Sequence, residues 1–496
     1  MQAPGFSHGV ADPIILYNKY IGGGILRKYR DVFILITFFI LGFLVFKFQG
    51  MISQDCLYNF GFANQLYNGH IPYKDYNLVI FPLFAYIMAP FSADFSSFIL
   101  FSSLFQSIMF TIIMENISNK NGKLIFFVIC CLKLWIFPFI DYNMFMIFFA
   151  IISYIYLIKY QKYHKSKDLF LTGLFLSLAL CSKQSMPGII IVLITPIILF
   201  HCLKEKKYLD FGLYAIGGCL PVFIICSLAV LSGTFYDMLD YALLGVKSFS
   251  ELAMTQSIAI AFIFSVFLIV SIIVLILLTY DLKNGLLSIA YFLPVFIILI
   301  LKDDRTALFG VMYVLALYYI LPNKKIEINS KIKSIMTNLT FIIVSVFYLL
   351  VVLRFVMVGI GYHQMVENTN YVKTNEYEWI SNEKIPEYLF EYIKDIDEYI
   401  ETNNDKKILP ISAFTKLYSL SSNKAFGLFE MLVDGNMGVK NFESIPNILE
   451  EYDLLLVVNV NMLMQYDGIY KYIEKNYELY EKIPIVGTTG YVYKTK

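Results

Sequence analysis

The sequence predicts a polytopic α-helical membrane protein of about eleven transmembrane helices, followed by a small C-terminal α/β domain. Hydrophobic residues make up 58% of the 496 residues and charged residues only 16%, whereas soluble domains carry about 25% charged residues. Apolar runs of membrane-spanning length recur as far as residue 358. The last part differs, because residues 361–496 hold 13 basic and 21 acidic side chains. This composition excludes an ordinary soluble enzyme, and it leaves no basic patch of the kind that binds nucleic acid.

The membrane domain is expected at residues 31–360, after a cytoplasmic N-terminal segment of residues 1–30. Its apolar runs, each long enough to cross a bilayer, lie near residues 31–48, 96–114, 123–140, 143–158, 169–182, 188–203, 211–231, 257–280, 285–301, 306–321 and 335–358. A twelfth stretch, residues 78–91, is short and is broken by Pro82 and Pro90. It suits a surface or re-entrant helix within a first external loop of residues 49–95 better than a span.

Basic residues in the loops predict the orientation, because cytoplasmic loops of membrane proteins carry an excess of Lys and Arg. With the N-terminus in the cytoplasm, the inward loops hold 18 basic residues and the outward loops of the membrane domain hold eight. An odd number of spans then leaves the C-terminal domain outside. We therefore expect a multi-pass protein of the cell membrane with a cytoplasmic N-terminus and an extracytoplasmic C-terminal domain.

The C-terminal domain, residues 361–496, alternates helix and strand patterns. Residues 385–402 place isoleucine and leucine side chains on one helical face, and residues 469–483 show a similar helical period. Residues 408–411 and 454–458 are short apolar runs suited to buried strands, and residues 490–493 close with a strand. Alternation of this kind predicts a small α/β domain.

Neither a disulfide framework nor a metal site is indicated. All seven cysteines precede residue 227, and the C-terminal domain has none. No Cys-x-x-Cys pair and no Cys/His spacing typical of a metal site occurs. The sequence therefore identifies no certain cofactor, and a divalent cation is the one possible cofactor that it does not exclude.

Polar and turn-forming residues are concentrated in the first external loop. Asp55 directly follows the first span, a helical segment then leads to the turn Gly69-His70-Ile71-Pro72-Tyr73-Lys74-Asp75, and Pro82-Leu83 starts the next apolar stretch. This arrangement resembles the first external loop of the GT-C class of integral membrane glycosyltransferases, the superfamily of protein mannosyltransferases and aminoarabinose transferases. The matching positions are Asp55, Gly69, Pro72, Tyr73, Lys74, Asp75, Pro82 and Leu83. Lys183-Gln184 at the end of a span, the eleven-helix topology and the external α/β domain are also similar to that class.

The resemblance implies an inverting glycosyltransferase that moves a single sugar from a polyprenyl-phosphate donor to a cell-envelope glycan, lipid or protein acceptor. Such a hexosyl- or pentosyltransferase works at the outer face of the membrane, among membrane lipids and without nucleic acid. A lipid-linked donor suits that location, because nucleotide sugars are not available outside the cell membrane. In such a transfer one carboxylate takes the proton of the acceptor hydroxyl, and a cation stabilises the charge that grows on the leaving phosphate.

The resemblance also assigns roles to individual residues. It makes Asp55 the catalytic carboxylate, and it places a second catalytic acid at Asp141, at the external end of the third span. The residues expected to bind substrate are Tyr73, Lys74, Asp75, Lys183, Gln184, Lys302 and Arg305.

Two positions depart from the family pattern. Cys56 follows Asp55 where relatives often have a second acid, so a single carboxylate must act. Ile80 stands two residues before Pro82-Leu83, where relatives often have Lys. The donor phosphate is therefore expected to bind one of the cations Lys183, Lys302 and Arg305. The planar guanidinium group of Arg305 can donate two parallel hydrogen bonds to a phosphate.

Each candidate also has a purely structural interpretation. Asp55 could cap a helix that starts at Cys56, and Asp141 could cap the span that follows it. Asp75 is expected to stabilise its turn. Lys183 could extend its ammonium group to the lipid headgroups, as could the other two cations.

Two other classes of function compete with glycosyl transfer. A transporter or flippase for lipid-linked glycans would show internal repeats, half-helices or charges in the middle of spans. Here the ionisable residues collect at the outer ends of the spans, and no repeat is detected. A catalytically silent scaffold with a partner-binding domain would leave Asp55 unexplained. Glycosyl transfer is therefore favoured, and the transporter is the alternative.

Overall fold

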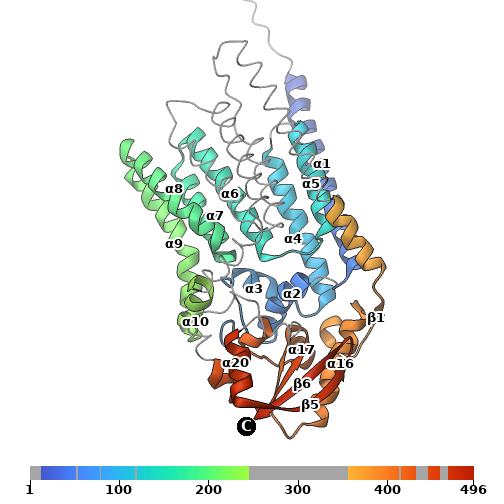
Figure 1. The fold of residues 1–496 in the computed structure, drawn as a ribbon. Coiled ribbons are helices and arrows are strands. Elements are labelled where there is room, and N and C mark those ends of the chain that lie inside the picture. Colours follow the sequence, from blue (N-terminus) through green and yellow to red (C-terminus); the bar gives the residue numbers. More distant parts are fainter. Residues whose placement is uncertain are drawn as a thin grey trace, which may run out of the picture.

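Seven long helices in the described part of the chain form a bundle, and a smaller domain of strands and helices lies at one end of it (Figure 1). The computed structural model describes residues 13–51, 54–78, 80–117, 120–244, 353, 356–412, 415–431, 445–458 and 467–496. The long helices are α1 (Pro13–Gln49), α4 (Phe95–Asn116), α5 (Lys120–Ile136), α6 (Tyr142–Tyr163), α7 (Ser166–Ser182), α8 (Ser185–Lys204) and α9 (Tyr208–Leu231).

The long helices coincide with the first seven predicted apolar runs. Five of them, within α1, α4, α6, α8 and α9, are long and apolar enough to cross a membrane. The other two, α5 and α7, have 17 residues each, which is the lower end of the range for a transmembrane helix. The predicted runs 257–280, 285–301 and 306–321, and most of 335–358, lie outside the described residues, and so do Lys302 and Arg305.

Helix α7 is the centre of one half of the bundle, where it packs against α6, α8 and α9, while α1 packs against α4 and α5. The approach of α7 to α9 depends on two glycines. A Cβ atom added at Gly173 would lie 2.2 Å from the carbonyl oxygen of Tyr214, and one added at Gly217 would lie 2.2 Å from that of Phe170. Helix backbones in membranes approach this closely only where the facing residues are small.

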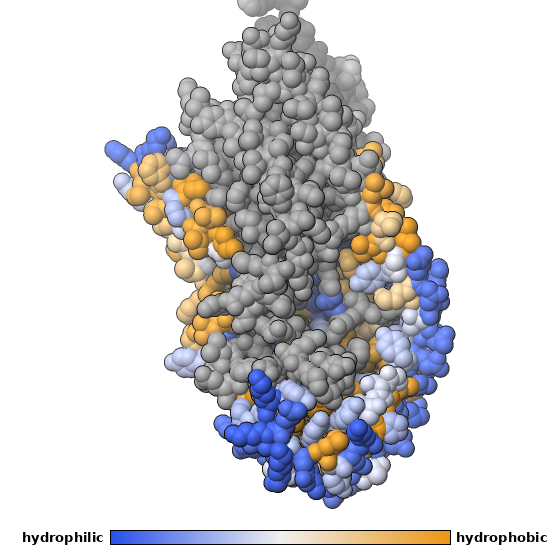
Figure 2. All heavy atoms as spheres, in the orientation of Figure 1, coloured by the Kyte–Doolittle hydropathy of each residue, from blue (hydrophilic) through white to orange (hydrophobic). Residues whose placement is uncertain are grey.

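Apolar side chains are exposed along the flanks of the bundle. Phe33 in α1 and Phe223 and Leu231 in α9 are among the most exposed large hydrophobic residues. Figure 2 shows orange surface over these flanks and mainly hydrophilic surface over the domain at the end of the bundle. Apolar surface of this kind on the described flanks is unusual for a protein surrounded by water alone and suits contact with lipid.

Short helices cover the end of the bundle next to the C-terminal domain, called here the domain-facing end. They are α2 (Gln54–Tyr67), α3 (Leu83–Met88), the 3-10 turn η1 (Ala89–Phe91), α10 (Phe235–Leu239) and the π-helical turn η2 (Asp240–Leu244). In the described residues of the predicted apolar stretch 78–91, the helical elements are a six-residue α-helix and one 3-10 turn. A six-residue helix is too short to span a membrane, and its surface or re-entrant position remains a prediction.

The C-terminal domain contains a four-stranded mixed sheet in the order β3-β4-β6-β5 and a separate antiparallel pair, β1 with β2. Strands β3 and β4 are parallel, and β6 is antiparallel to both of its neighbours. Its elements are β1 (Tyr371–Lys373), η3 (Glu378–Ile380), β2 (Lys384–Pro386), α16 (Glu387–Thr402), β3 (Ile408–Ile411), α17 (Thr415–Ser422), η4 (Leu428–Met431), β4 (Leu454–Val458), α20 (Asp467–Asn476), β5 (Tyr477–Ile485) and β6 (Thr488–Thr495).

The predicted strands at 408–411 and 454–458 are confirmed as β3 and β4, whose residues are all buried. The helix predicted over residues 469–483 is only partly correct, because α20 ends at Asn476 and residues 477–485 form β5. This segment pairs with β6 through a turn at Gly487, whose φ of +69° favours glycine. Hydrogen bonds to the neighbouring strand therefore outweigh the helical period of its side chains.

Candidate functional site

The domain-facing end of the bundle brings together the loops that the sequence places outside. The C-terminal end of α1 and the start of α4 both contact Glu383 of the C-terminal domain, through Lys47 and Ser96. Successive long helices run in opposite directions (Figure 1). The loop before α6 and the junction of α7 with α8 therefore lie at the same end as α2.

Asp55 lies in the first turn of α2 and is half-buried. The helix includes Asp55 rather than starting after it, so this residue is not the cap of a helix that begins at Cys56. A carboxylate in the first turn still stabilises a helix through the helix dipole. Cys56 is buried, and burial, followed by the charge of Asp55, raises the pKa of its thiol well above its usual value. Of these two positions, Asp55 carries the carboxylate.

Asn59, one turn further along α2, connects Asp55 to the start of α6. Its side-chain amide donates to the backbone oxygen of Asp55 at 2.8 Å, and its Oδ1 accepts from the backbone N–H of Tyr142 at 3.3 Å. Tyr142 directly follows Asp141. Asn59 is only 2% exposed, so the amide joins the two segments inside the protein. Asn59 is not among the residues predicted from the sequence, although its spacing of four residues from Asp55 on a predicted helix is a usable signal.

Asp141 caps α6. Its Oδ1 accepts from the backbone N–H of Met144 at 2.7 Å, and its Oδ2 accepts from the side-chain amide of Asn143 at 3.0 Å. Asp141 is buried, with a relative exposure of 4%. The capping role predicted as one of two alternatives is thus confirmed, and a catalytic role of Asp141 remains a prediction.

Lys183 lies beside this capped helix start. It follows the last residue of α7, and its Nζ donates to Oδ1 of Asn143 at 2.7 Å and lies 5.5 Å from the centre of the Tyr142 ring. Asn143 therefore connects the Lys183 ammonium group to the Asp141 carboxylate. Gln184 is buried at the start of α8. Asp141 and Lys183 thus share one polar cluster at the domain-facing end, and Asn59 links the backbone of Asp55 to it.

The turn that carries the other expected substrate-binding residues is built from its own hydrogen bonds. Asp75 Oδ2 accepts from the backbone N–H of Ile71 at 2.7 Å, which confirms its turn-stabilising role. Tyr73 is buried at a φ of +69°, and its hydroxyl donates to the backbone oxygen of Ile80. Lys74 is exposed at the surface. Ile80 is 4% exposed, so this position suits an apolar side chain.

A buried lysine within the predicted apolar run 123–140 supports the same cluster. Lys133 in α5 is 1% exposed and donates to Gln106 Oε1 and, at 2.9 Å, to the backbone oxygen of Phe139. Gln106 donates in turn to the backbone oxygen of Pro138. These bonds satisfy carbonyl groups of the loop that leads to Asp141. A single lysine inside an apolar run is a signal for such a role.

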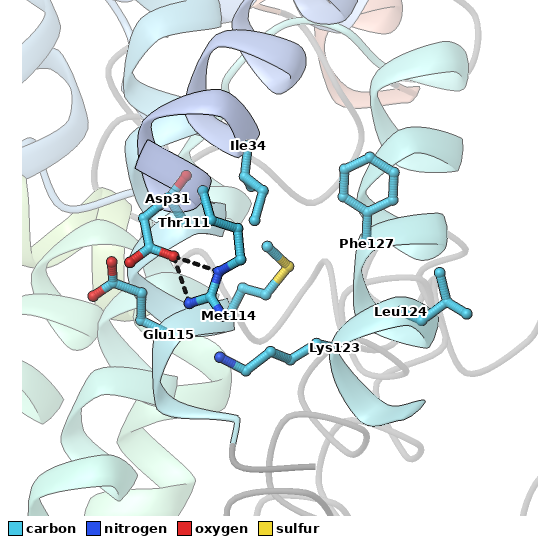
Figure 3. Close-up of a pocket in the computed structure, with 9 residues that line it drawn as sticks. Asp31, Ile34, Thr111, Met114, Glu115, Lys123, Leu124 and Phe127 are labelled. Atoms are coloured by element: carbon cyan, nitrogen blue, oxygen red, sulfur yellow. Dashed lines mark hydrogen bonds and ion pairs between the residues drawn. The ribbon is translucent and has the colours of Figure 1, made fainter. Parts of the chain in front are cut away.

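A second polar feature lies at the opposite end of the bundle and is separate from this cluster. A cavity of about 260 Å³ lies between α1, α4 and α5. In it Arg30 binds Asp31, near Glu115 and Lys123 (Figure 3). Its apolar side is formed by Ile34, Met114, Leu124 and Phe127. Among the described residues no group of three His, Cys, Asp or Glu side chains could hold a metal ion.

No protein-family model matches the chain, and no curated protein matches it. The resemblance to the GT-C class therefore stays a prediction that depends on the first loop and on the residues gathered near it.

Proposed function

We propose that the protein is an inverting glycosyltransferase of the GT-C type, which moves one sugar from a polyprenyl-phosphate donor to a cell-envelope acceptor at the outer face of the membrane. One observation carries the proposal: Asn59 hydrogen-bonds to the backbone oxygen of Asp55 and to the start of α6, where Asn143 joins Asp141 to Lys183. The segments that carry two acids and a cation, distant in sequence, are thus joined by hydrogen bonds at one end of the bundle.

The residues of this cluster suit the chemistry of the transfer. Asp55 takes the proton of the acceptor hydroxyl while the hydroxyl oxygen attacks the anomeric carbon. The bond from that carbon to the lipid phosphate breaks, and the Lys183 ammonium group stabilises the charge left on the phosphate. Asp141 holds the start of α6 and, through Asn143, the orientation of Lys183.

The position of the cluster suits a lipid-linked substrate. The cluster lies at the domain-facing end of the bundle, and Figure 2 shows apolar surface over the flanks of the bundle and hydrophilic surface over the C-terminal domain. A polyprenyl chain beside the bundle would therefore present its phosphate and sugar near this level. The described basic loops at residues 159–167 and 204–207 lie at the opposite end, which supports a cytoplasmic location for that end.

The test is the substitution Asp55→Asn in the purified full-length protein, incubated with a panel of polyprenyl-phosphate sugars. Asparagine keeps the size of the side chain, but its amide takes up no proton at neutral pH. Loss of a positioned base lowers a rate by about 10²–10⁴-fold. We expect this loss of transfer, and of slow donor hydrolysis, with donor binding retained.

Asp94→Asn is the matched control, because it is the same change in the same loop. Asp94 caps α4 by accepting from the backbone N–H of Ser97 at 2.8 Å, and asparagine caps helices equally well. The control should keep wild-type turnover. Wild-type turnover in a folded Asp55→Asn protein would instead exclude Asp55 as the base.

A further inference from the structure

A fully buried ion pair lies where the C-terminal domain contacts α2. Lys416 in α17 and Glu430 in η4 form the pair, and both side chains are 0% exposed. Burying two charges costs several kcal/mol per ion unless their remaining hydrogen-bonding positions are also filled. The residues that form these additional hydrogen bonds therefore show which segments the ion pair holds together.

Gln65 of α2 completes the pair. Its amide group donates to both carboxylate oxygens of Glu430 at 2.8 Å, and its Oε1 accepts from the Lys416 ammonium group. Within the C-terminal domain, Glu430 also accepts from the Ser419 hydroxyl at 2.7 Å and from the backbone N–H of Phe426 at 2.9 Å. The bonds from Gln65 exist only while α2 lies against the domain.

The shape of the contact is equally specific. A Cβ atom added at Gly61 would lie 2.8 Å from Cδ of Lys416, so α2 rests directly on the lysine chain. The Lys416 Nζ lies 5.3 Å from the centre of the Phe62 ring and 4.9 Å from that of Tyr76, within the range of a cation–π interaction. Two backbone hydrogen bonds between residues 75–77 and Gly427 continue the contact.

We propose that the C-terminal domain positions the catalytic helix: the cluster Gln65–Lys416–Glu430 holds α2 in place and thereby sets the location of Asp55. This inference rests on the proposed function. Asp55 and Gln65 are ten residues apart on one helix, a separation of about 15 Å along its axis. Because a short helix moves as a rigid unit, fixing its last turn limits the movement of its first turn. Gln65, Lys416 and Glu430 are thus positioning residues.

A second contact between the C-terminal domain and the helix bundle allows the positioning of α2 to be tested separately from the attachment of the domain. Glu383 of the C-terminal domain accepts from Lys47 at the end of α1 and from Ser96 in α4. This contact does not involve α2. A change at Gln65 should therefore loosen α2 while the domain stays attached to the bundle.

The experiment is an exchange of the amide and the carboxylate in the full-length protein. Gln65→Glu places a second carboxylate beside Glu430 with only one lysine between them, whereas Gln65→Glu/Glu430→Gln restores one carboxylate, one amide and one ammonium group. Hydrogen exchange of the α2 backbone amides reports the position of the helix, and steady-state kinetics separate kcat from the donor KM. The control is Glu451→Gln, which removes the exposed Lys407–Glu451 pair of the same domain.

We expect Gln65→Glu to speed exchange throughout α2 and to lower kcat by about 10²-fold, the typical cost of a 1 Å misplacement, with the donor KM little changed. The double exchange should restore both values, and Glu451→Gln should change neither. Unchanged α2 exchange in Gln65→Glu would overturn the proposal, and so would faster exchange with wild-type kcat. A wild-type protein without transferase activity would instead refute the proposed function, while the exchange rates would still decide whether the domain holds α2.

Discussion

Removing the ammonium group from the buried pair is the sharpest test of how the C-terminal domain is held together. Lys416→Met keeps most of the side-chain volume but leaves the Glu430 carboxylate buried and without its cation. Its remaining donors are Gln65, Ser419 and the backbone of Phe426. Breaking a buried ion pair by removing one partner costs about 3–5 kcal/mol. For a domain of this size that corresponds to a fall in Tm of roughly 10–20 °C.

A second substitution tests whether the uncompensated charge is the cause. In Lys416→Met/Glu430→Gln no charge remains, and the new amide can still accept from Ser419 and Phe426 while donating to Gln65. Replacing both members of a buried pair by neutral groups is often nearly neutral for stability. The double variant should therefore recover most of the Tm lost by the single variant.

The chain contains its own reporter for this measurement. It has two tryptophans, and Trp379 lies at the contact, with its ring centre 6.0 Å from that of Phe60 in α2 and its Nε1 donating to Ser421 in α17 at 3.1 Å. In a Trp135→Phe background, thermal unfolding followed by fluorescence reports this region alone. A fall in Tm of less than about 3 °C for Lys416→Met, below the shift for 1 kcal/mol, would refute the reasoning, as would a double variant no more stable than the single one.

Three further predictions concern the donor cation, the helix bundle and the topology. Lys183→Met should lower kcat/KM for the donor by about 10–100-fold, the value of a hydrogen bond to a charged group, whereas Lys162→Met should leave it unchanged; equal kinetics in both would place the phosphate elsewhere. Gly217→Ala should destabilise the solubilised protein by about 1–3 kcal/mol or more, because its Cβ would meet a backbone oxygen of α7 at 2.2 Å. Gly212→Ala in the same helix, whose Cβ would meet nothing within 4 Å, should not lower its Tm. In a cysteine-free protein, a membrane-impermeant maleimide added to intact cells should label Lys424→Cys but not Lys162→Cys, and the opposite pattern would reverse the proposed orientation.

The part of the fold that depends on local composition could be predicted from the sequence. The first seven apolar runs are helices, because a long apolar run in lipid can satisfy its backbone only as a helix. Strands β3 and β4 are short apolar runs and were predicted with their observed bounds. Strand β5 was not, because its side chains fit a helical period and only the hydrogen bonds from β6 make it a strand.

The candidate site divides in the same way. The turn role of Asp75 and the capping role of Asp141 involve partners within four residues, so the sequence predicted the first and offered the second as one of two alternatives. Asn59 reaches Tyr142 across 83 residues, and Lys416 reaches Gln65 across 351. No periodicity or spacing in a single sequence specifies such pairs, because burial is what makes them necessary. Folding removes these polar groups from water, so each must find its hydrogen-bond partner inside the protein. Only the tertiary structure therefore decided that α2 lies between the start of α6 and the C-terminal domain.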